Sequence, residues 1–231
     1  MELSEIQNGM IRMALVALES VHEATYHHSI RTAKVSIHIA AKVDWCLSES
    51  DRASYLDDIR DAALLHDIGK LSCPTQILDK KESLTDRERE NILCHPIWGA
   101  DMLLTLPDKR LQRIARFVRE HHEQPDGKGY PFRLDLDEIA PISRVINIAD
   151  RFAAMTENRP YRKAVPTEVA LEILHLDIKA FFGEKAGAVT DALVGFKMKP
   201  GLVHIPAKVL SASGTSYREV RESGLSLAAA H

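Results

Sequence analysis

The sequence has few cysteines and no long apolar run, and each shortage excludes a class of protein. Its 231 residues include 3 cysteines. Cys46, Cys73 and Cys94 are widely spaced and form no CxxC pair, so neither a disulfide framework nor a zinc ribbon is expected. No stretch approaches the roughly 18 apolar residues of a membrane span, and the chain begins acidic rather than basic. We therefore expect a cytoplasmic protein without a membrane span.

The chain also lacks an excess of positive charge, internal repeats and low-complexity tracts. Its formal net charge is -3, which gives no overall basic field for a nucleic acid polymer or an anionic membrane. A hydrophobic content of 45% is enough for one sizeable core. One main domain is expected, and any phosphate-binding surface on it must be local.

Apolar residues recur at spacings of three and four, which predicts an all-α fold built from amphipathic helices. The expected helices cover 6–21, 28–43, about 48–66, a segment beginning at the capping box 85–88 and carrying His95, 108–122, 141–152, and a stretch after Pro166. Residues 71–84 and 124–139 are expected to be irregular. Residues 203–220 have the pattern of a short β-hairpin.

Side chains of metal-ligand type gather on these helices and at their ends. There are seven of them: His28, His66, Asp67, His95, His121, His122 and Asp150. Imidazole with carboxylate suits iron or manganese better than structural zinc or calcium. Adjacent pairs at a helix end can address two ions, and two ions can clamp a phosphoryl oxygen and activate a water. The pattern predicts a binuclear centre for phosphoester hydrolysis.

Five other histidines have no evident partner of metal-ligand type in the sequence and are interpreted as ordinary surface or core residues. They are His22, His38, His175, His204 and His231.

Two ordered motifs give the sequence a family resemblance. The segment HDIGK at 66–70 and the segment HHEQPDGKGYP at 121–131 resemble the HD-GYP family patterns HDxGK and HHExxDGxGYP. Further matches are HSIR at 28–31, His95-Pro96, Ala149-Asp150 and RPYR at 159–162, so the resemblance covers about residues 26–175. It implies an HD-superfamily helical bundle, with an N-terminal helix at 1–25, a catalytic domain at 26–195 and a C-terminal extension of unknown role at 196–231.

The resemblance also assigns roles to residues. It implies that the seven side chains bind metals, with Asp67 bridging two ions and Lys70 acting on the phosphate. Some family members hold a third metal through a glutamate, but Ala24 stands at that position and Glu23 is one residue away, so a third ion is not expected. By composition alone, Lys70 could equally be a solvated lysine after a glycine C-cap.

Substrate contacts are expected in the loop after His122 and in the RPYR segment. Gly127 and Gly129 allow positive φ or close backbone approach, and Tyr130 offers a face for stacking on guanine, with Pro131 stiffening the exit. The predicted substrate-binding residues are Lys70, Asp126, Gly127, Gly129, Tyr130, Arg159 and Arg162, and the predicted catalytic residues are Asp67 and Lys70. The alternatives are a tight structural turn and a solvated arginine pair.

Three positions depart from the family pattern. Ala153 stands where an acidic residue is frequent, and Arg133 and Leu136 stand where glycine is frequent. None of the three is a proposed ligand, so the departures bear on substrate access and specificity.

The leading hypothesis is a metal-dependent phosphodiesterase that hydrolyses cyclic di-GMP to pGpG, with a second cut to GMP left open. Two alternatives stay open: a phosphohydrolase for another cyclic dinucleotide or a nucleotide, and a non-catalytic cyclic di-GMP sensor or scaffold. Because family members commonly carry a sensory domain, a regulatory protein partner or a homo-oligomer is also expected.

Overall fold

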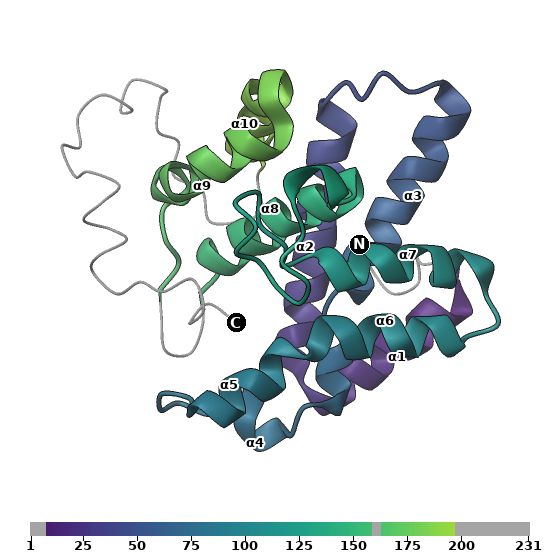
Figure 1. The fold of residues 1–231 in the computed structure, drawn as a ribbon, viewed down its shortest axis with the longest axis vertical. Coiled ribbons are helices and arrows are strands. Elements are labelled where there is room, and N and C mark those ends of the chain that lie inside the picture. The colour runs from purple at the N-terminus through teal and green to yellow at the C-terminus, as the bar shows by residue number, and fades with distance from the viewer. Residues whose placement is uncertain (1–7, 159–162, 197–231) are drawn as a thin grey trace.

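The first two helices belong to the frame of the molecule, and the second has contacts with several later helices. The computed structural model describes residues 8–158 and 163–196. Helix α1 (Gly9–Val21) begins where the Asn8 side chain accepts hydrogen bonds from the amides of Met10 and Ile11. Helix α2 (Glu23–Lys42) passes through the middle of the molecule, where it packs against α1, α3, α8 and α10 (Figure 1).

The start of α2 differs from the sequence prediction. The helix begins at Glu23 rather than at His28, because the His22 side chain accepts a hydrogen bond from the Thr25 amide and caps it. Histidine is not a preferred N-cap residue, so the apolar pattern alone placed the start one turn too late. His22 is therefore a structural residue, which agrees with its interpretation as unrelated to the ligand set.

The next segment contains more helix than the sequence predicted. Helix α3 (Glu49–Leu65) is followed by the 3₁₀-helix η2 (Ile68–Ser72) and the single turn α4 (Thr75–Leu78), so the prediction of a loop over 71–84 was wrong in part. Short turns of this kind leave no periodic signal in the sequence. The predicted capping box is confirmed: Thr85 and Glu88 bond reciprocally and begin α5 (Asp86–Leu93).

The remaining helices agree with the predicted order. They are α6 (His95–Thr105), α7 (Lys109–Glu120), the 3₁₀-helix η3 (Leu136–Glu138), α8 (Pro141–Met155), α9 (Thr167–Phe182), the 3₁₀-helix η4 (Gly183–Lys185) and α10 (Ala186–Gly195). The all-α prediction is confirmed, since no strand occurs in residues 8–158 or 163–196. The hairpin predicted at 203–220 lies outside the described residues.

One continuous apolar core holds the helices together. Ile11, Leu15 and Leu18 of α1 belong to the same cluster as residues of α2, α3, α7 and α8. Helix α8 is buried along most of its length from Ile142 to Met155, so it forms the centre of the domain against which the other elements pack. Within the described part of the chain, none of the helices is both long and apolar enough to cross a bilayer.

Candidate metal centre

Helix ends, together with positions within α2 and α8, bring the seven predicted ligand residues to one buried place. His66 and Asp67 follow the last residue of α3, His95 begins α6, and His121 and His122 follow α7. His28 lies in the first half of α2, and Asp150 lies in α8. Each of the seven side chains is at most 5% exposed: His28, His66, Asp67, His95, His121, His122 and Asp150. Residues separated by up to 122 positions thus share one interior site.

Three of the imidazoles are oriented by the same backbone device. The Nδ1–H groups of His66, His95 and His121 donate to the carbonyls of the residues three positions earlier, at 2.8, 2.7 and 2.6 Å. A carbonyl oxygen can only accept, so each Nδ1 carries the proton. In a neutral ring Nε2 then presents its lone pair, and in all three rings it faces the interior of the site.

The Nε2 lone pairs of these rings face one another, and a neutral ring of this tautomer has no proton on Nε2 to donate. His95 Nε2 lies 3.3 Å from His121 Nε2, and both rings have their Nδ1 proton committed to a carbonyl. His66 Nε2 makes no hydrogen bond to any described residue, and it lies 3.4 Å from Asp67 Oδ2 and 3.7 Å from Asp150 Oδ1. Facing acceptors in a buried site are unfavourable unless a cation lies between them. The geometry therefore fits a bound cation.

The ligand atoms fall into two groups, each compact enough for one ion. His95, His121 and His122 form one group, and the second consists of His28, His66 and Asp67, with the atoms of each group within 4.8 Å of one another. The groups adjoin, because the rings of His66 and His121 have centroids 5.0 Å apart. Asp67 Oδ1 lies 3.2 Å from His95 Nε2, so this carboxylate reaches both groups. Asp150 Oδ1 lies 2.7 Å from His28 Nε2 and joins the second group.

The ionisation of the site suits metal binding. Burial alone would raise the pKa of Asp67, but Lys70, His66 and His95 outweigh it and hold that pKa well below its ordinary value. Burial, with the neighbouring His66 and His95, lowers the pKa of His121 far below that of a free imidazole. Metal ligands must be an ionised carboxylate and a neutral imidazole, and these are the forms that the site favours.

The pKa of His66 shifts in the opposite direction to that of His121, because of two nearby carboxylates. Burial would lower its pKa, but Asp67 and Asp150 together raise it. The two carboxylates thus attract positive charge to this part of the site, where a divalent ion would supply more than a proton does. The donor set and its electrostatics indicate a divalent metal centre.

Lys70 is part of this site and not a solvated lysine. Its side chain is 7% exposed, and its Nζ donates to Asp67 Oδ2 at 2.7 Å. Gly69 explains how η2 comes so close, because a Cβ on Gly69 would lie 2.0 Å from the carbonyl oxygen of His95. The glycine of the HDIGK segment is therefore needed for contact between η2 and α6, and the C-cap alternative is wrong.

The loop of residues 124–139 folds back over the end of α7. Buried Glu123 accepts hydrogen bonds from the amides of Phe132 at 2.7 Å and Leu134 at 3.0 Å. Gly127 has φ 68°, and a Cβ on Gly129 would lie 2.3 Å from the amide nitrogen of Gln124, so the first is needed for its conformation and the second for close approach. Both features agree with the expectation from the sequence.

Tyr130 closes one side of the centre. Its ring stacks on His122 with centroids 4.6 Å apart and an interplanar angle of 24°. Burial, and then the charges of Asp150 and Asp67, raise the pKa of its hydroxyl well above the ordinary value. One face of Tyr130 is thus occupied by His122.

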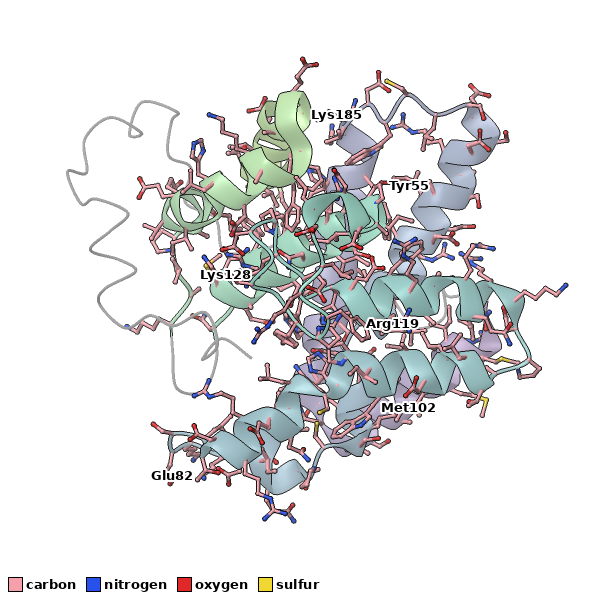
Figure 2. All side chains as sticks on the ribbon, in the orientation of Figure 1. Tyr55, Glu82, Met102, Arg119, Lys128 and Lys185 are labelled. Carbon is pink, nitrogen blue, oxygen red and sulfur yellow. The ribbon has the colours of Figure 1, made fainter. Side chains whose placement is uncertain are left out.

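Other predicted residues lie farther from the ligand cluster or are not described. Asp126 is exposed, and its carboxylate accepts from the backbone and the side chain of Lys128 (labelled in Figure 2). Arg159 and Arg162 lie outside the described residues. Glu23 is exposed and lies beside His27.

The three departures from the family pattern have different structural settings. Ala153 is fully buried in the core face of α8. Arg133 has φ 56°, in the left-handed region where glycine is favoured. The carbonyl of Leu136 accepts a hydrogen bond from Arg144 Nη2 at 2.7 Å, so this residue helps to anchor the end of the loop.

Sequence reasoning missed several residues that position the site. Asn147 of α8 donates from Nδ2 to the carbonyls of His121 at 2.9 Å and Glu123 at 3.0 Å. Arg151, one turn later, bonds Asp177 Oδ2 at 2.6 Å and ties α8 to α9. Glu120 accepts from the Ala140 amide and the Ser143 hydroxyl. Glu123 stood within a quoted motif, but Asn147 and Arg151 lie in a helical stripe that gave no sign of their partners.

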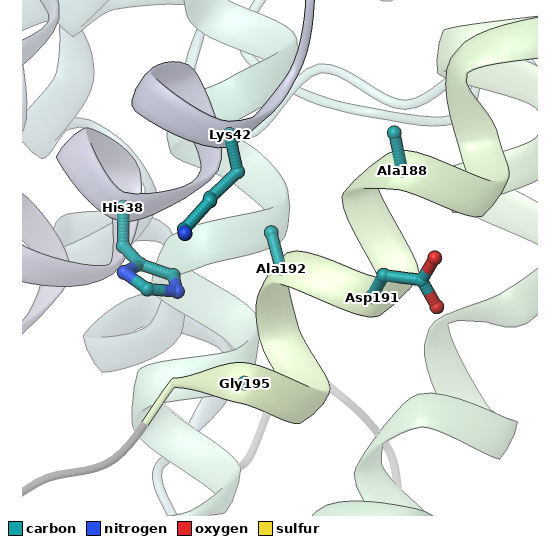
Figure 3. A pocket seen from close by; sticks show the side chains of 6 residues that line it. All are labelled: His38, Lys42, Ala188, Asp191, Ala192 and Gly195. Carbon is teal, nitrogen blue, oxygen red and sulfur yellow. The ribbon is translucent and has the colours of Figure 1, made fainter.

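Two cavities differ in their relation to the centre. One, of about 240 Å³, lies between α5, the loop and α8 and is bordered by His122 and Tyr130. The other, of about 370 Å³, lies between the far end of α2 and α10, where His38 and Lys42 point toward α10 and Asp191 is turned away from them (Figure 3). The first adjoins the metal centre, and the second contains none of its ligands.

Comparison with known proteins gives a consistent family. A family model described as HD domain matches residues 13–183. A 3'3'-cGAMP-specific phosphodiesterase of Vibrio cholerae is 39% identical over 150 residues, which cover 65% of this chain and 31% of the relative. A cyclic di-GMP phosphodiesterase of Pseudomonas aeruginosa is 35% identical over 175 residues, covering 70% of this chain and 38% of the relative. The chain thus spans about a third of the length of these relatives.

Solved structures agree with the fold. The HD domain of the Listeria monocytogenes phosphodiesterase PgpH has a TM-score of 0.57 at 19% identity and covers 78% of this chain and 95% of that domain. A protein from Bdellovibrio bacteriovorus described as an HDG"Y"P protein has a TM-score of 0.54 at 22% identity, with 73% of this chain and 52% of that chain covered. These similarities support the helical architecture described above.

Proposed function

The chain belongs to the HD domain family, and from this premise we propose that it is a metal-dependent phosphodiesterase that hydrolyses cyclic di-GMP to pGpG. The observation that carries the proposal is the meeting of imidazole lone pairs and carboxylates, with His95 Nε2 3.3 Å from His121 Nε2 and Asp67 Oδ1 3.2 Å from His95 Nε2. The matching relatives named for cyclic dinucleotides supply the substrate class.

The seven side chains supply enough donor atoms for two ions. We assign His95, His121 and His122 to one ion, and His28, His66 and Asp150 to the other, with Asp67 between them. Nitrogen and oxygen donors without thiolate suit iron or manganese. Two such ions supply Lewis acidity, a water of lowered pKa and charge for the attacking and leaving oxygens.

The chain's own residues orient this chemistry. The Ala63, Ile92 and Val118 carbonyls hold the rings in the tautomer that binds metal. Lys70 has its Nζ on Asp67 Oδ2, where it keeps the carboxylate ionised and adds positive charge beside the scissile phosphate. Tyr130 and its loop exclude water from one side.

Substrate contacts are proposed from the loop and beyond it. Tyr130 is assigned to stack on a guanine through the face opposite His122, supported by Gly127, Gly129 and Asp126 in the same loop. Arg159 and Arg162 are assigned to the substrate's phosphates on the basis of the RPYR motif alone. A cytoplasmic location accords with free Cys46, Cys73 and Cys94. A regulatory partner or a second copy of the chain stays a prediction.

A second candidate substrate is 3'3'-cGAMP. The relative of 39% identity is named as specific for it, and Arg133 and Leu136 alter the loop that lies near the substrate. The metal centre would be the same, and only the contacts to one base would differ.

The test combines metal analysis with product identification. Protein purified without oxygen is analysed for iron and manganese and then supplied with cyclic di-GMP and 3'3'-cGAMP side by side. We expect two metals per chain, release of pGpG, and a higher kcat/KM for cyclic di-GMP. A preference for 3'3'-cGAMP would select the second candidate, and metal-loaded protein inert toward both would refute the proposal.

A variant pair tests the role of the central carboxylate. Asp67→Asn removes the charge that reaches both ion sites, so we expect loss of metal and a fall in turnover of at least about 100-fold. Asp101→Asn is the matched control, because Asp101 is exposed on α6 and makes no described contact with the site. Full turnover in Asp67→Asn would contradict the assigned role.

A further inference from the structure

The cavity beside the metal centre has an uneven distribution of charge. Its lining includes Arg89 of α5, Lys128 of the loop and Arg151 of α8, and none of its lining residues carries a carboxylate. His122 and Tyr130 border the same cavity, so a ligand in it would extend directly from the metal centre. A cavity lined by cations and connected to such a centre favours an anionic group.

Two of the three cations already have partners. Arg151 Nη1 lies 2.6 Å from Asp177 Oδ2, and Lys128 Nζ lies 3.1 Å from Asp126 Oδ2. Arg89 has neither a hydrogen bond nor an ion pair with any residue in the described ranges. It is half-buried, and it shares a helix face with Ile92 and Leu93, which also line the cavity. Arg89 is therefore the cation whose charge is left for a ligand.

The local structure holds Arg89 in this position. The capping box of Thr85 and Glu88 fixes the first turn of α5, and Glu88 Oε2 also accepts from Lys80 Nζ at 2.6 Å. Buried Ile92 anchors the other end of the same helix face. The charge of the neighbouring Glu88 is thus engaged by Lys80 and the helix cap instead of by Arg89.

On the basis of the proposed function, we propose that Arg89 binds the phosphate of the cyclic dinucleotide that is not being cleaved. A cyclic dinucleotide carries two phosphodiesters, and when one is at the metal centre the other projects away from it into the adjoining space. A guanidinium presents forked donors that match two phosphate oxygens. Arg89 would then distinguish a cyclic dinucleotide from a small phosphodiester with a single phosphate.

The experiment compares a substrate with two phosphates and one with a single phosphate. Arg89→Ala is expected to lower kcat/KM for cyclic di-GMP by at least about tenfold, mainly through KM. The same variant is expected to leave kcat/KM for bis(4-nitrophenyl) phosphate unchanged. Arg89→Lys should recover part of the loss, and Arg87→Ala, on the exposed side of α5, should behave as the unaltered protein.

The other outcomes separate this inference from the proposed function. An equal loss on both substrates, or no loss on either, overturns the role of Arg89. If the unaltered protein cleaves bis(4-nitrophenyl) phosphate but not cyclic di-GMP, the proposed function fails, and calorimetric titration with pGpG tests Arg89 separately. Weaker pGpG binding by Arg89→Ala would then support a dinucleotide contact, and equal binding would overturn it.

Discussion

A single methyl group on Gly69 should disrupt the metal centre without touching any ligand. A Cβ there would lie 2.0 Å from the His95 carbonyl oxygen, 2.6 Å from the Gly99 amide nitrogen and 2.9 Å from the His95 carbonyl carbon. All three atoms belong to the backbone of α6, so no side chain can rotate out of the way. To reach ordinary contact, η2 and α6 must separate by more than about 1 Å.

That separation acts on the site because the two elements carry different parts of it. Asp67 and Lys70 lie at η2, and His95 begins α6, with Asp67 Oδ1 3.2 Å from His95 Nε2. For Gly69→Ala we expect a loss of about 1–3 kcal/mol in the free energy of unfolding, typical of overpacking. A displacement of about 1 Å in catalytic geometry should also lower turnover by about 100-fold, with loss of metal.

Urea unfolding, metal content and turnover of cyclic di-GMP measure these effects in one series of variants. Gly99→Ala should be milder, because its Cβ would meet the Gly69 amide nitrogen and the side chain of Val118 at 3.1 Å. Gly187→Ala has nothing within 4 Å and should be neutral or slightly stabilising. If Gly69→Ala keeps its full metal content and turnover, the close approach of η2 and α6 does not govern the site.

Two further substitutions test the loop. Glu123→Gln should lower the free energy of unfolding by about 1–3 kcal/mol, because the backbone amide of either Phe132 or Leu134 loses its acceptor. Unchanged hydrogen-exchange protection at both amides would contradict this role of Glu123. Arg133→Gly should stabilise the protein by about 0.5 kcal/mol, because relief of the left-handed conformation exceeds the entropy cost of glycine. Arg133→Ala should give no gain in stability in urea unfolding. An equal gain in both variants would refute the conformational explanation.

The clustering of the seven predicted ligands could be foreseen from the sequence, because their residue types suit metal binding and they occur in an ordered series of motifs. The motifs at 66–70 and 121–131 contain four of the seven predicted ligands, His66, Asp67, His121 and His122, and place them at the ends of predicted helices. The structure brings all seven side chains into one buried cluster. The order of the helices could also be predicted, since the spacing of apolar residues indicates which helix faces are buried.

The supporting residues could not be predicted, since their roles depend on partners far along the chain. Asn147 holds the carbonyls of His121 and Glu123, which are 26 and 24 residues away. Gly69 looked like a helix cap, because a sequence does not reveal that another backbone passes 2.0 Å from a missing Cβ. The lack of an ion pair for Arg89 among residues 8–158 and 163–196 is likewise a property of the packed structure, because the acidic residues around it in the sequence have other positions or partners.

Helix ends link the folding of the chain to the chemistry of the site. His66, His95 and His121 each follow the end of a helix, namely α3, α5 and α7, and each donates to a carbonyl in the last turn of that helix. Carbonyls in the last turn of a helix lack the regular amide donor four residues later, so the imidazole adds a hydrogen bond at the helix end while its tautomer is fixed. The same helix ends carry partial negative charge, which favours a cation where the three rings meet. Moving any one of these three histidines by a residue would therefore cost both a helix cap and a donor of the cluster, whereas His28 and Asp150 reach the cluster from within α2 and α8.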